Sequence, residues 1–393
     1  MHIHAAALLL VIVCIGCRSD QPPQQRDGLP RWTIVREARA GVGDGPGALT
    51  AVGGLTVGGD GSVYVTQPQE GVVRSYDRAG RFVRKIGREG SGPGEFDGPL
   101  RLGWRGDTLW VQDPGNQRIT FFRADGTYLR SLSFMRAAEL TDGRPQIPGY
   151  VLADGSVLGY WQAPLSLLAD PKGVSVPLVS FTEAGEAASL LGRMERRNEF
   201  SEMKSGTSVT YSPQPFTDAQ MMDVPPDGSG VVIVTRDAAM SAEGATFRVR
   251  RIDPSGRSTL DRRYGYRPVR LREAAADSVV TELAEGLAGT RIRTPPAAVL
   301  RRELRAKLFL PRHLAPVTSV VLGRDGTIWL RREDTGAPTV WWHVLDTAGN
   351  IVANLRLPTN LSVHYADRTR LWAVERDDMD VPTLVGYRVS VAR

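Results

Sequence analysis

An internal repeat of 46 to 47 residues constrains the fold of this chain more than any other feature. Gly45-Pro46-Gly47 recurs as Gly92-Pro93-Gly94, and Val63-Tyr64-Val65 recurs as Leu109-Trp110-Val111. This period is typical of β-propellers, in which each repeat forms one small antiparallel sheet called a blade. A chain of 393 residues can therefore be one domain that grows by adding blades.

Short turns divide each repeat into strands. Residues 75–83 match residues 121–129, and each segment contains two strands joined by a glycine turn. Asp-Gly pairs precede further β-rich runs, and both residue types tolerate the positive φ angles of tight turns. These pairs are Asp60-Gly61, Asp154-Gly155, Asp227-Gly228 and Asp325-Gly326. The pattern predicts an all-β fold, and 42 glycines with 26 prolines argue against a helical bundle.

Counting the four-stranded units predicts six blades. The expected blades span 55–86, 100–133, 147–191, 218–264, 317–357 and 361–390. The last unit contains only three strands, whereas Trp32–Arg36 precedes the first Gly-Pro-Gly much as Phe82–Ile86 precedes the second. We therefore expect the amino-terminal strand to complete blade six and close the ring, which removes exposed sheet edges. The aromatic residues that recur in second strands are interpreted as packing between blades: Tyr64, Trp110, Trp329 and Trp372.

Blades one and two, roughly residues 45–133, resemble NHL-type repeats. The residues that carry this resemblance are Gly92–Phe96, Leu109–Ile119 and Phe122–Gly126. The whole chain is similar to exported bacterial six-bladed propellers of the NHL and TolB-like kind. The resemblance implies a propeller fold. Such folds serve binding proteins, lactonases and lyases alike, so the architecture alone does not select a function.

The amino terminus predicts an exported protein with a lipid anchor. Residues 5–15 form an uncharged apolar run of signal-peptide length, which ends at Cys14-Ile15-Gly16-Cys17. This ending resembles a bacterial lipoprotein signal, in which the last cysteine is acylated. We expect a signal peptide over 1–16, a lipidated tether over 17–30 that starts at Cys17, and the propeller over 31–393. The protein would then face the periplasm or the exterior; the alternative is an ordinary cleaved signal with an incidental cysteine.

The basic balance does not indicate a nucleic-acid partner. The net charge is +6, from 49 basic and 43 acidic residues, and the arginines are spread along the chain beside acidic residues. This pattern favours a solvated, partly ion-paired surface. After cleavage before Cys17 no other cysteine remains, so disulfides cannot stabilise the mature domain. We expect a monomer.

Residues 270–310 interrupt the strand pattern and predict a helical hairpin between blades four and five. The expected apolar faces contain Val280, Leu283 and Leu287 in the first helix and Leu300, Leu304, Lys307 and Leu308 in the second. Arg301, Arg302 and Arg305 lie along the other side of the second helix and are candidates for binding an anionic ligand or lipid head group. The hairpin is interpreted either as a clamp that buries its apolar stripe or as a lid over the channel.

Candidate catalytic residues are scarce. His313, His343 and His364 occupy unlike places in their units, without the short spacing that puts two imidazoles on one metal. Asp113 and Asn116 precede a third strand, where such side chains most often bond local backbone. We therefore assign no catalytic residue, no metal ligand and no cofactor. Six-bladed lactonases and lyases bind Ca²⁺ or Zn²⁺ at the channel mouth, but no motif here supports either ion.

The sequence does not decide which class of function the protein has. The leading hypothesis is a lipid-anchored envelope propeller that binds a peptide, glycan or protein without catalysis. The alternative is a metal-dependent hydrolase or lyase, lactonase-like, with its site at the central channel. A third reading is a component of an envelope assembly. The side chains that line the channel would separate these classes best, because a cluster of carboxylates there would favour an enzyme.

Overall fold

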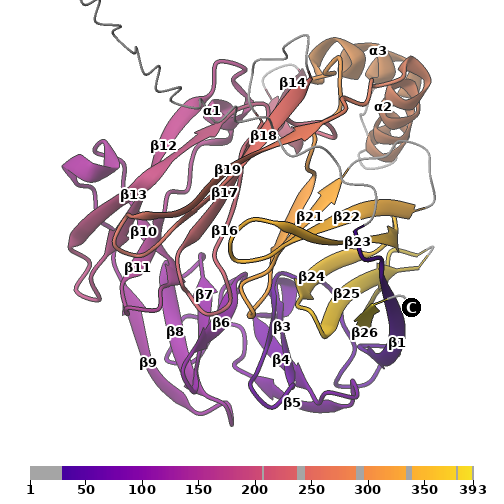
Figure 1. The fold of residues 1–393 in the computed structure, drawn as a ribbon. Helices are drawn as coiled ribbons and strands as arrows, with labels where there is room; N and C mark the ends of the chain where they lie inside the picture. Colours follow the sequence, from indigo (N-terminus) through magenta and orange to yellow (C-terminus); the bar gives the residue numbers. More distant parts are fainter. Residues whose placement is uncertain are drawn as a thin grey trace, which may run out of the picture.

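The structure is a computed structural model that describes residues 29–205, 208–236, 244–288, 296–332, 339–377 and 379–391. Within these residues the strands form six four-stranded antiparallel sheets and one two-stranded sheet. The four-stranded sheets are the blades of a β-propeller (Figure 1). The prediction of an all-β, six-bladed fold is confirmed.

Blades one to three follow the chain in order, each starting with its innermost strand. Blade one contains β2 (Leu55–Val57), β3 (Val63–Gln67), β4 (Val72–Tyr76) and β5 (Phe82–Ile86). Blade two contains β6 (Leu102–Arg105), β7 (Thr108–Asp113), β8 (Arg118–Arg123) and β9 (Tyr128–Ser133). Blade three contains β10 (Ile147–Val151), β11 (Val157–Tyr160), β12 (Val174–Phe181) and β13 (Ala187–Arg196).

Blades four to six complete the ring. Blade four contains β16 (Met221–Asp223), β17 (Val231–Arg236), β18 (Ala245–Ile252) and β19 (Ser258–Tyr266). Blade five contains β20 (Ser319–Leu322), β21 (Ile328–Arg332), β22 (Thr339–Leu345) and β23 (Ile351–Pro358). Blade six contains β24 (Ser362–Ala366), β25 (Arg370–Arg376), β26 (Pro382–Val391) and β1 (Trp32–Ala40).

The two ends of the chain close blade six. Its strand order is β1-β26-β25-β24, so the amino-terminal strand lies outermost. β1 pairs antiparallel with β26 from Trp32 opposite Val391 to Ala40 opposite Leu384. The ring of Trp32 also lies 5.7 Å from the ring of Trp329 in blade five. Hydrogen bonds between β1 and β26 therefore close the ring, as the sequence predicts.

The repeated Gly-Pro-Gly loops are held by an arginine on the third strand of their blade. Arg74 Nε donates to the carbonyl oxygen of Pro46 over 2.9 Å, and Arg118 Nη2 donates to that of Gly92 over 2.9 Å. Gly94 has a φ of +76°, which a side chain would strain. The repeat therefore reflects the loops that precede each blade.

The Asp-Gly turns form as the sequence predicts. The side chains of Asp60, Asp154 and Asp227 each accept a hydrogen bond over 2.9 Å from the backbone N–H two residues further on. The glycines that follow them have φ between +68° and +92°. These local bonds fix the tight turn between first and second strands, and so the register of each blade.

Aromatic side chains of the second strands pack between blades. Trp329 and Trp372 are almost fully buried, each in a cluster that joins two neighbouring blades. Tyr64 lies edge-on to Trp104 of the next blade, with ring centroids 5.1 Å apart. Trp110 likewise packs in a cluster that joins blade two to blade three. The interpretation of these aromatics as inter-blade packing is confirmed.

Two insertions extend the propeller. Helices α2 (Glu273–Ala288) and α3 (Ala297–Lys307) form the predicted hairpin between blades four and five. A second hairpin, β14 (Phe200–Ser205) with β15 (Ser208–Pro213), lies between blades three and four and was not predicted. A short helix, α1 (Leu165–Ala169), joins β11 to β12. Figure 1 shows α2, α3 and β14 at the same end of the molecule.

The apolar stripe of the helical hairpin is buried. Its cluster contains Val280, Ala284, Leu300, Leu304 and Leu308, and Met203 of β14 packs against it. The two insertions therefore support each other. The prediction that Lys307 shares the buried face was wrong: its side chain is exposed, because the next residue, Leu308, fills the place beside Leu304.

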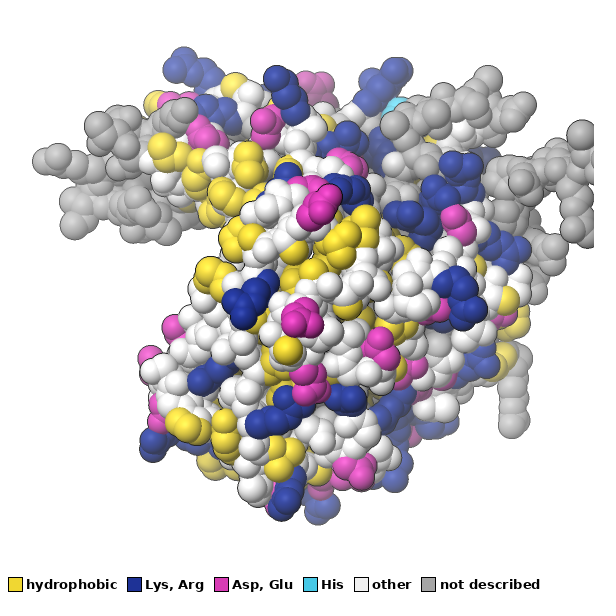
Figure 2. Space-filling model, turned by 90° about the vertical axis from the view of Figure 1, so that its left-hand side faces the viewer, with side chains coloured by type: hydrophobic (Ala, Val, Ile, Leu, Met, Phe, Trp, Pro, Cys, Tyr) yellow, Lys and Arg dark blue, Asp and Glu magenta, His cyan; other side chains and the backbone are white. Residues whose placement is uncertain are grey.

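The outer surface mixes charges of both signs. On the side shown in Figure 2, basic and acidic side chains alternate with each other and with apolar ones. Ion pairs such as Arg193 with Asp142 at 2.8 Å and Arg130 with Glu183 at 2.9 Å are exposed. Such pairs contribute little stability each. The surface matches the expected solvated, partly ion-paired pattern.

The predicted signal peptide over 1–16, and the tether with Cys17 up to residue 28, lie outside the described residues. Across the described ranges, no helix combines the length with the apolar character that a membrane span needs. The lipid anchor therefore stays a prediction.

We predict that removing β1 destabilises the ring far more than shortening the tether. A chain that starts at residue 41 loses the ladder between β1 and β26 and exposes the edge of β26. At roughly 1 kcal/mol per ladder hydrogen bond, its melting temperature should fall by on the order of 10 °C. Calorimetry should find that a control chain starting at residue 29 has the same melting temperature as the full-length protein. Equal melting of the two truncations would contradict closure by β1.

Candidate functional site

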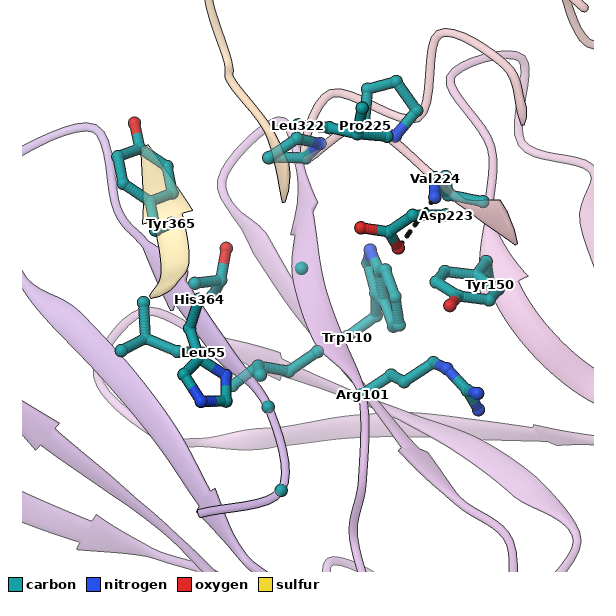
Figure 3. A pocket seen from close by; sticks show the side chains of 16 residues that line it. Leu55, Arg101, Trp110, Tyr150, Asp223, Val224, Pro225, Leu322, His364 and Tyr365 are labelled. Carbon is teal, nitrogen blue, oxygen red and sulfur yellow. Dashed lines mark hydrogen bonds between the residues drawn. The ribbon is translucent and has the colours of Figure 1, made fainter. Parts of the chain in front are cut away.

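The first strands of all six blades line a cavity at the centre of the ring. Its volume is about 230 Å³, and each of β2, β6, β10, β16, β20 and β24 contributes to its wall. The side chains that enter it include Trp110, Tyr150, Asp223 and His364 (Figure 3). Six segments that lie far apart in the sequence therefore meet in this channel.

Asp223 is the carboxylate of this channel. It ends β16, and its Oδ1 accepts a hydrogen bond of 2.9 Å from the backbone N–H of Val224. Burial raises the pKa of Asp223 from its ordinary value to about 6, although the Val224 N–H, the charge of Arg101 and the hydroxyl of Tyr150 act in the opposite direction. Asp223 makes no ion pair with any residue that the structure describes.

Arg101 carries the positive charge of the channel wall. Its Nη1 donates to Gln112 Oε1 over 2.7 Å. Its guanidinium lies 5.0 Å from the ring centroid of Tyr150 and 5.1 Å from that of Tyr160. These contacts hold the guanidinium against the tyrosines of blade three. Its charge also lowers the pKa of Asp223.

Two aromatic rings surround the carboxylate. Trp110 and Tyr150 meet edge to face with centroids 6.2 Å apart. Figure 3 shows the Asp223 carboxylate next to the indole nitrogen of Trp110, with the Tyr150 ring on its other side. Gly103 makes this arrangement possible, because a Cβ there would come within 2.6 Å of the Trp110 indole. The aromatic ring that packs between blades two and three thus also forms part of the channel wall.

The opposite wall of the channel is electrically neutral near physiological pH. Burial, aided by the charge of Arg376, lowers the pKa of His364 to about 4, so its imidazole is uncharged at pH 7. The hydroxyl of its neighbour Tyr365 donates to Asp367 over 2.7 Å. Asp223 and Arg101 are therefore the charged side chains of this cavity.

A larger groove opens beside the channel. Its volume is about 1070 Å³, and its walls come from β16, α2, the segment 213–220 and the segment 311–320. Most of its lining is apolar, including Phe216, Met222 and Val279. Asp223 lines both the groove and the channel cavity. The two cavities therefore share Asp223 as a lining residue.

The two insertions build one side of the groove. Phe200 of β14 and Val279 of α2 both line it. The backbone N–H of Phe309 donates to Gln214 Oε1 over 3.0 Å, which ties the end of the helical hairpin to the end of β15. Arg331 of β21 also lines the groove, and its Nε is buried without an acceptor among the described residues.

The arginines singled out in the sequence lie on α3, and none of them lines the channel or the groove. Arg301 and Arg302 are exposed. Arg305 forms ion pairs with Glu273, at 3.0 Å, and with Asp277, both on α2. It therefore joins the two helices, and the binding of an anion by these arginines stays a prediction.

The histidines and the Asx pair have separate surroundings. His343 is buried in blade five beside Asn354, whereas His364 faces the channel. Asp113 accepts a bond of 2.9 Å from the backbone N–H of Asp97, and Asn116 donates to Gly90 O over 2.9 Å. Both Asx side chains thus bond the backbone of the loop before blade two, and not the backbone of their own turn as expected.

Sequence reasoning did not identify Asp223. It stands in Met221-Met222-Asp223-Val224, which contains no motif. Its one signal is its place in the first strand of a blade, because that strand lines the channel of a propeller. In the described part of the chain, no group of three or more His, Cys, Asp or Glu side chains is placed to hold a metal ion.

No protein-family model matches this chain, and no curated protein does. Solved structures resemble it at low similarity. A member of the DUF4221 family from Bacteroides vulgatus is 10% identical, with a TM-score of 0.49 over 93% of this chain and 100% of that chain. A catalytically inactive virginiamycin B lyase from Staphylococcus aureus is 11% identical, with a TM-score of 0.40 over 92% and 99%. The PQQ-bound aldose sugar dehydrogenase from Streptomyces coelicolor is 12% identical, with a TM-score of 0.39 over 94% and 100%. These likenesses carry no argument about what this chain binds.

We predict that Asp223→Asn stabilises the protein at neutral pH. Because the pKa of Asp223 is raised to about 6, the folded protein is penalised once the carboxyl ionises. The amide removes this penalty, and a gain of about 1 to 2 kcal/mol is expected at pH 7.5, discounted for solvent in the channel. The gain should shrink as the pH falls from about 6 to about 4, where the carboxyl is neutral in both states.

Chemical denaturation at several pH values measures this gain. The exposed Asp107→Asn serves as the matched control and should show no such pH dependence. A loss of stability in Asp223→Asn at pH 7.5 would show that the carboxylate is a structural contact.

Proposed function

We propose that this protein is a non-enzymatic binding module that takes an extended peptide segment into the groove beside its channel. The observation that carries the proposal is the groove itself, whose volume of about 1070 Å³ lies at the upper end of ligand sites in proteins. Its apolar walls suit peptide side chains better than a glycan, which would need a polar lining. We further propose that Cys17 anchors the protein in the envelope of a bacterium.

The polar groups of the groove support a peptide. The buried Nε of Arg331 offers an unused donor, which suits a backbone carbonyl oxygen. The groove is also built from β14–β15 and α2–α3, which closing a six-bladed ring does not require. Specificity on such additions to a rigid scaffold is a common arrangement.

An enzyme is the second candidate, and Asp223 is the feature that favours it. A carboxyl whose pKa lies near 6, beside the phenol of Tyr150, has the properties of a general acid or base. The metal-dependent form of this alternative has no candidate ligand set among the described residues. Stoichiometric Ca²⁺ or Zn²⁺ in the purified protein would nevertheless favour the enzyme.

The binding proposal predicts that Val279→Glu abolishes peptide retention. The probe is a library of hexapeptides of Ala, Val, Leu, Ile and Phe, measured by affinity selection and mass spectrometry. A carboxylate at residue 279 would stand in the apolar groove, and retention should fall at least about tenfold. The control Val299→Glu changes an exposed valine of α3 that does not line the groove and should retain peptides as the wild type does. Equal retention by both variants would contradict the groove as the site.

The anchoring proposal predicts that Cys17→Ser leaves the protein unacylated, because the sulfur that would carry the lipid is gone. Incorporation of radiolabelled palmitate in a bacterial host measures this directly. The variant Cys14→Ser should still incorporate label. Label in Cys17→Ser equal to that in the wild type would exclude the assigned anchor.

A further inference from the structure

We infer that the channel end of the groove binds a primary ammonium group, so that the protein holds its peptide by a free amino terminus at Asp223. This inference rests on the proposed peptide-binding function and names the part of the peptide that the site recognises. Three observations support it: Asp223 lines both cavities, its carboxylate makes no ion pair with the described residues, and two aromatic rings lie beside it.

Asp223 lies in a wall that the groove shares with the channel cavity. Asp223 lines the groove of about 1070 Å³ and also the channel cavity of about 230 Å³. A peptide in the groove therefore meets this carboxylate where the wide space narrows. The smaller cavity beyond it has room for the side chain of a first residue.

The carboxylate lacks a cation. The backbone N–H of Val224 donates a hydrogen bond to it, and the Tyr150 hydroxyl also favours its ionised form, but it makes no ion pair with the described residues. Arg101 and His364 line the same cavity, but neither forms an ion pair with this carboxylate. Arg101 is held by Gln112 against two tyrosine rings, and His364 on the opposite wall is uncharged at pH 7. A buried carboxylate without a paired charge is costly, and a bound ammonium would remove that cost.

The aromatic rings select a cation over a neutral donor. Trp110 and Tyr150 lie beside the carboxylate at an edge-to-face angle, with centroids 6.2 Å apart. Indole and phenol faces attract ammonium groups, and the attraction grows when water is excluded. A sugar hydroxyl could bond the carboxylate but would leave its charge uncompensated.

Three forms of the apolar hexapeptide library test this inference. The first has a free amino terminus, the second is N-acetylated, and the third is N-acetylated with a lysine at position one. Affinity selection at pH 7.5 compares their retention on the full-length protein. The wild type should retain the free form at least about tenfold more than the acetylated form, the effect of one charge-assisted bond. Asp223→Asn should retain both forms equally, whereas Asp107→Asn should behave as the wild type.

Each outcome tests a different part of the proposal. If the wild type retains the free and acetylated forms equally, and Val279→Glu retains neither, the ammonium site is wrong but the groove remains the peptide site. Retention of the lysine form at the level of the free form would keep the ammonium site but overturn the assignment to the amino terminus. Retention of none of the three forms would overturn the peptide-binding function itself. Because Asp223→Asn is expected to be more stable than the wild type, loss of folding does not obscure the comparison.

Discussion

The hydrogen-bonded ladder between β1 and β26 is the constraint on which the rest of the structure depends. It joins residues 32–40 to the opposite end of the chain and leaves no blade with a missing strand. Once the ring is closed, the first strands of six blades must converge on one axis. Asp223 of blade four then lies beside Trp110 of blade two in a cavity that no single blade could form. The candidate site therefore forms only when the ring of six blades is closed.

A closed ring can also carry an unfavourable group at its centre. The raised pKa of Asp223 means that its ionised form opposes folding, whereas large inter-blade clusters around Trp329 and Trp372 stabilise the ring elsewhere. The groove is supported in the same way. Its walls are held by a separate apolar cluster in which α2, α3 and β14 meet. The main stabilising clusters and the candidate site thus lie in different parts of the molecule.

The sequence predicted those features that local chemistry determines. The Asp-Gly turns, the Gly-Pro-Gly loops and the missing strand of blade six each leave a pattern within a few residues, and each was found in the structure. The β14–β15 hairpin was not predicted because residues 200–213 contain neither the Asp-Gly nor the Gly-Pro-Gly signal that marked the blades. Asp223 escaped because its surroundings come from other blades. Arg305 attracted attention as a cation, yet its carboxylate partners lie on the neighbouring helix.

Hydrogen exchange with and without a retained hexapeptide tests most directly whether the groove and the channel form one ligand site. The account predicts slower exchange in residues 213–224 and 271–280, which line the groove and meet the channel at Asp223. It predicts no change in β8 and β9 of blade two, which line neither cavity. Protection confined to segments away from the groove, such as the outer strands of other blades, would contradict the account.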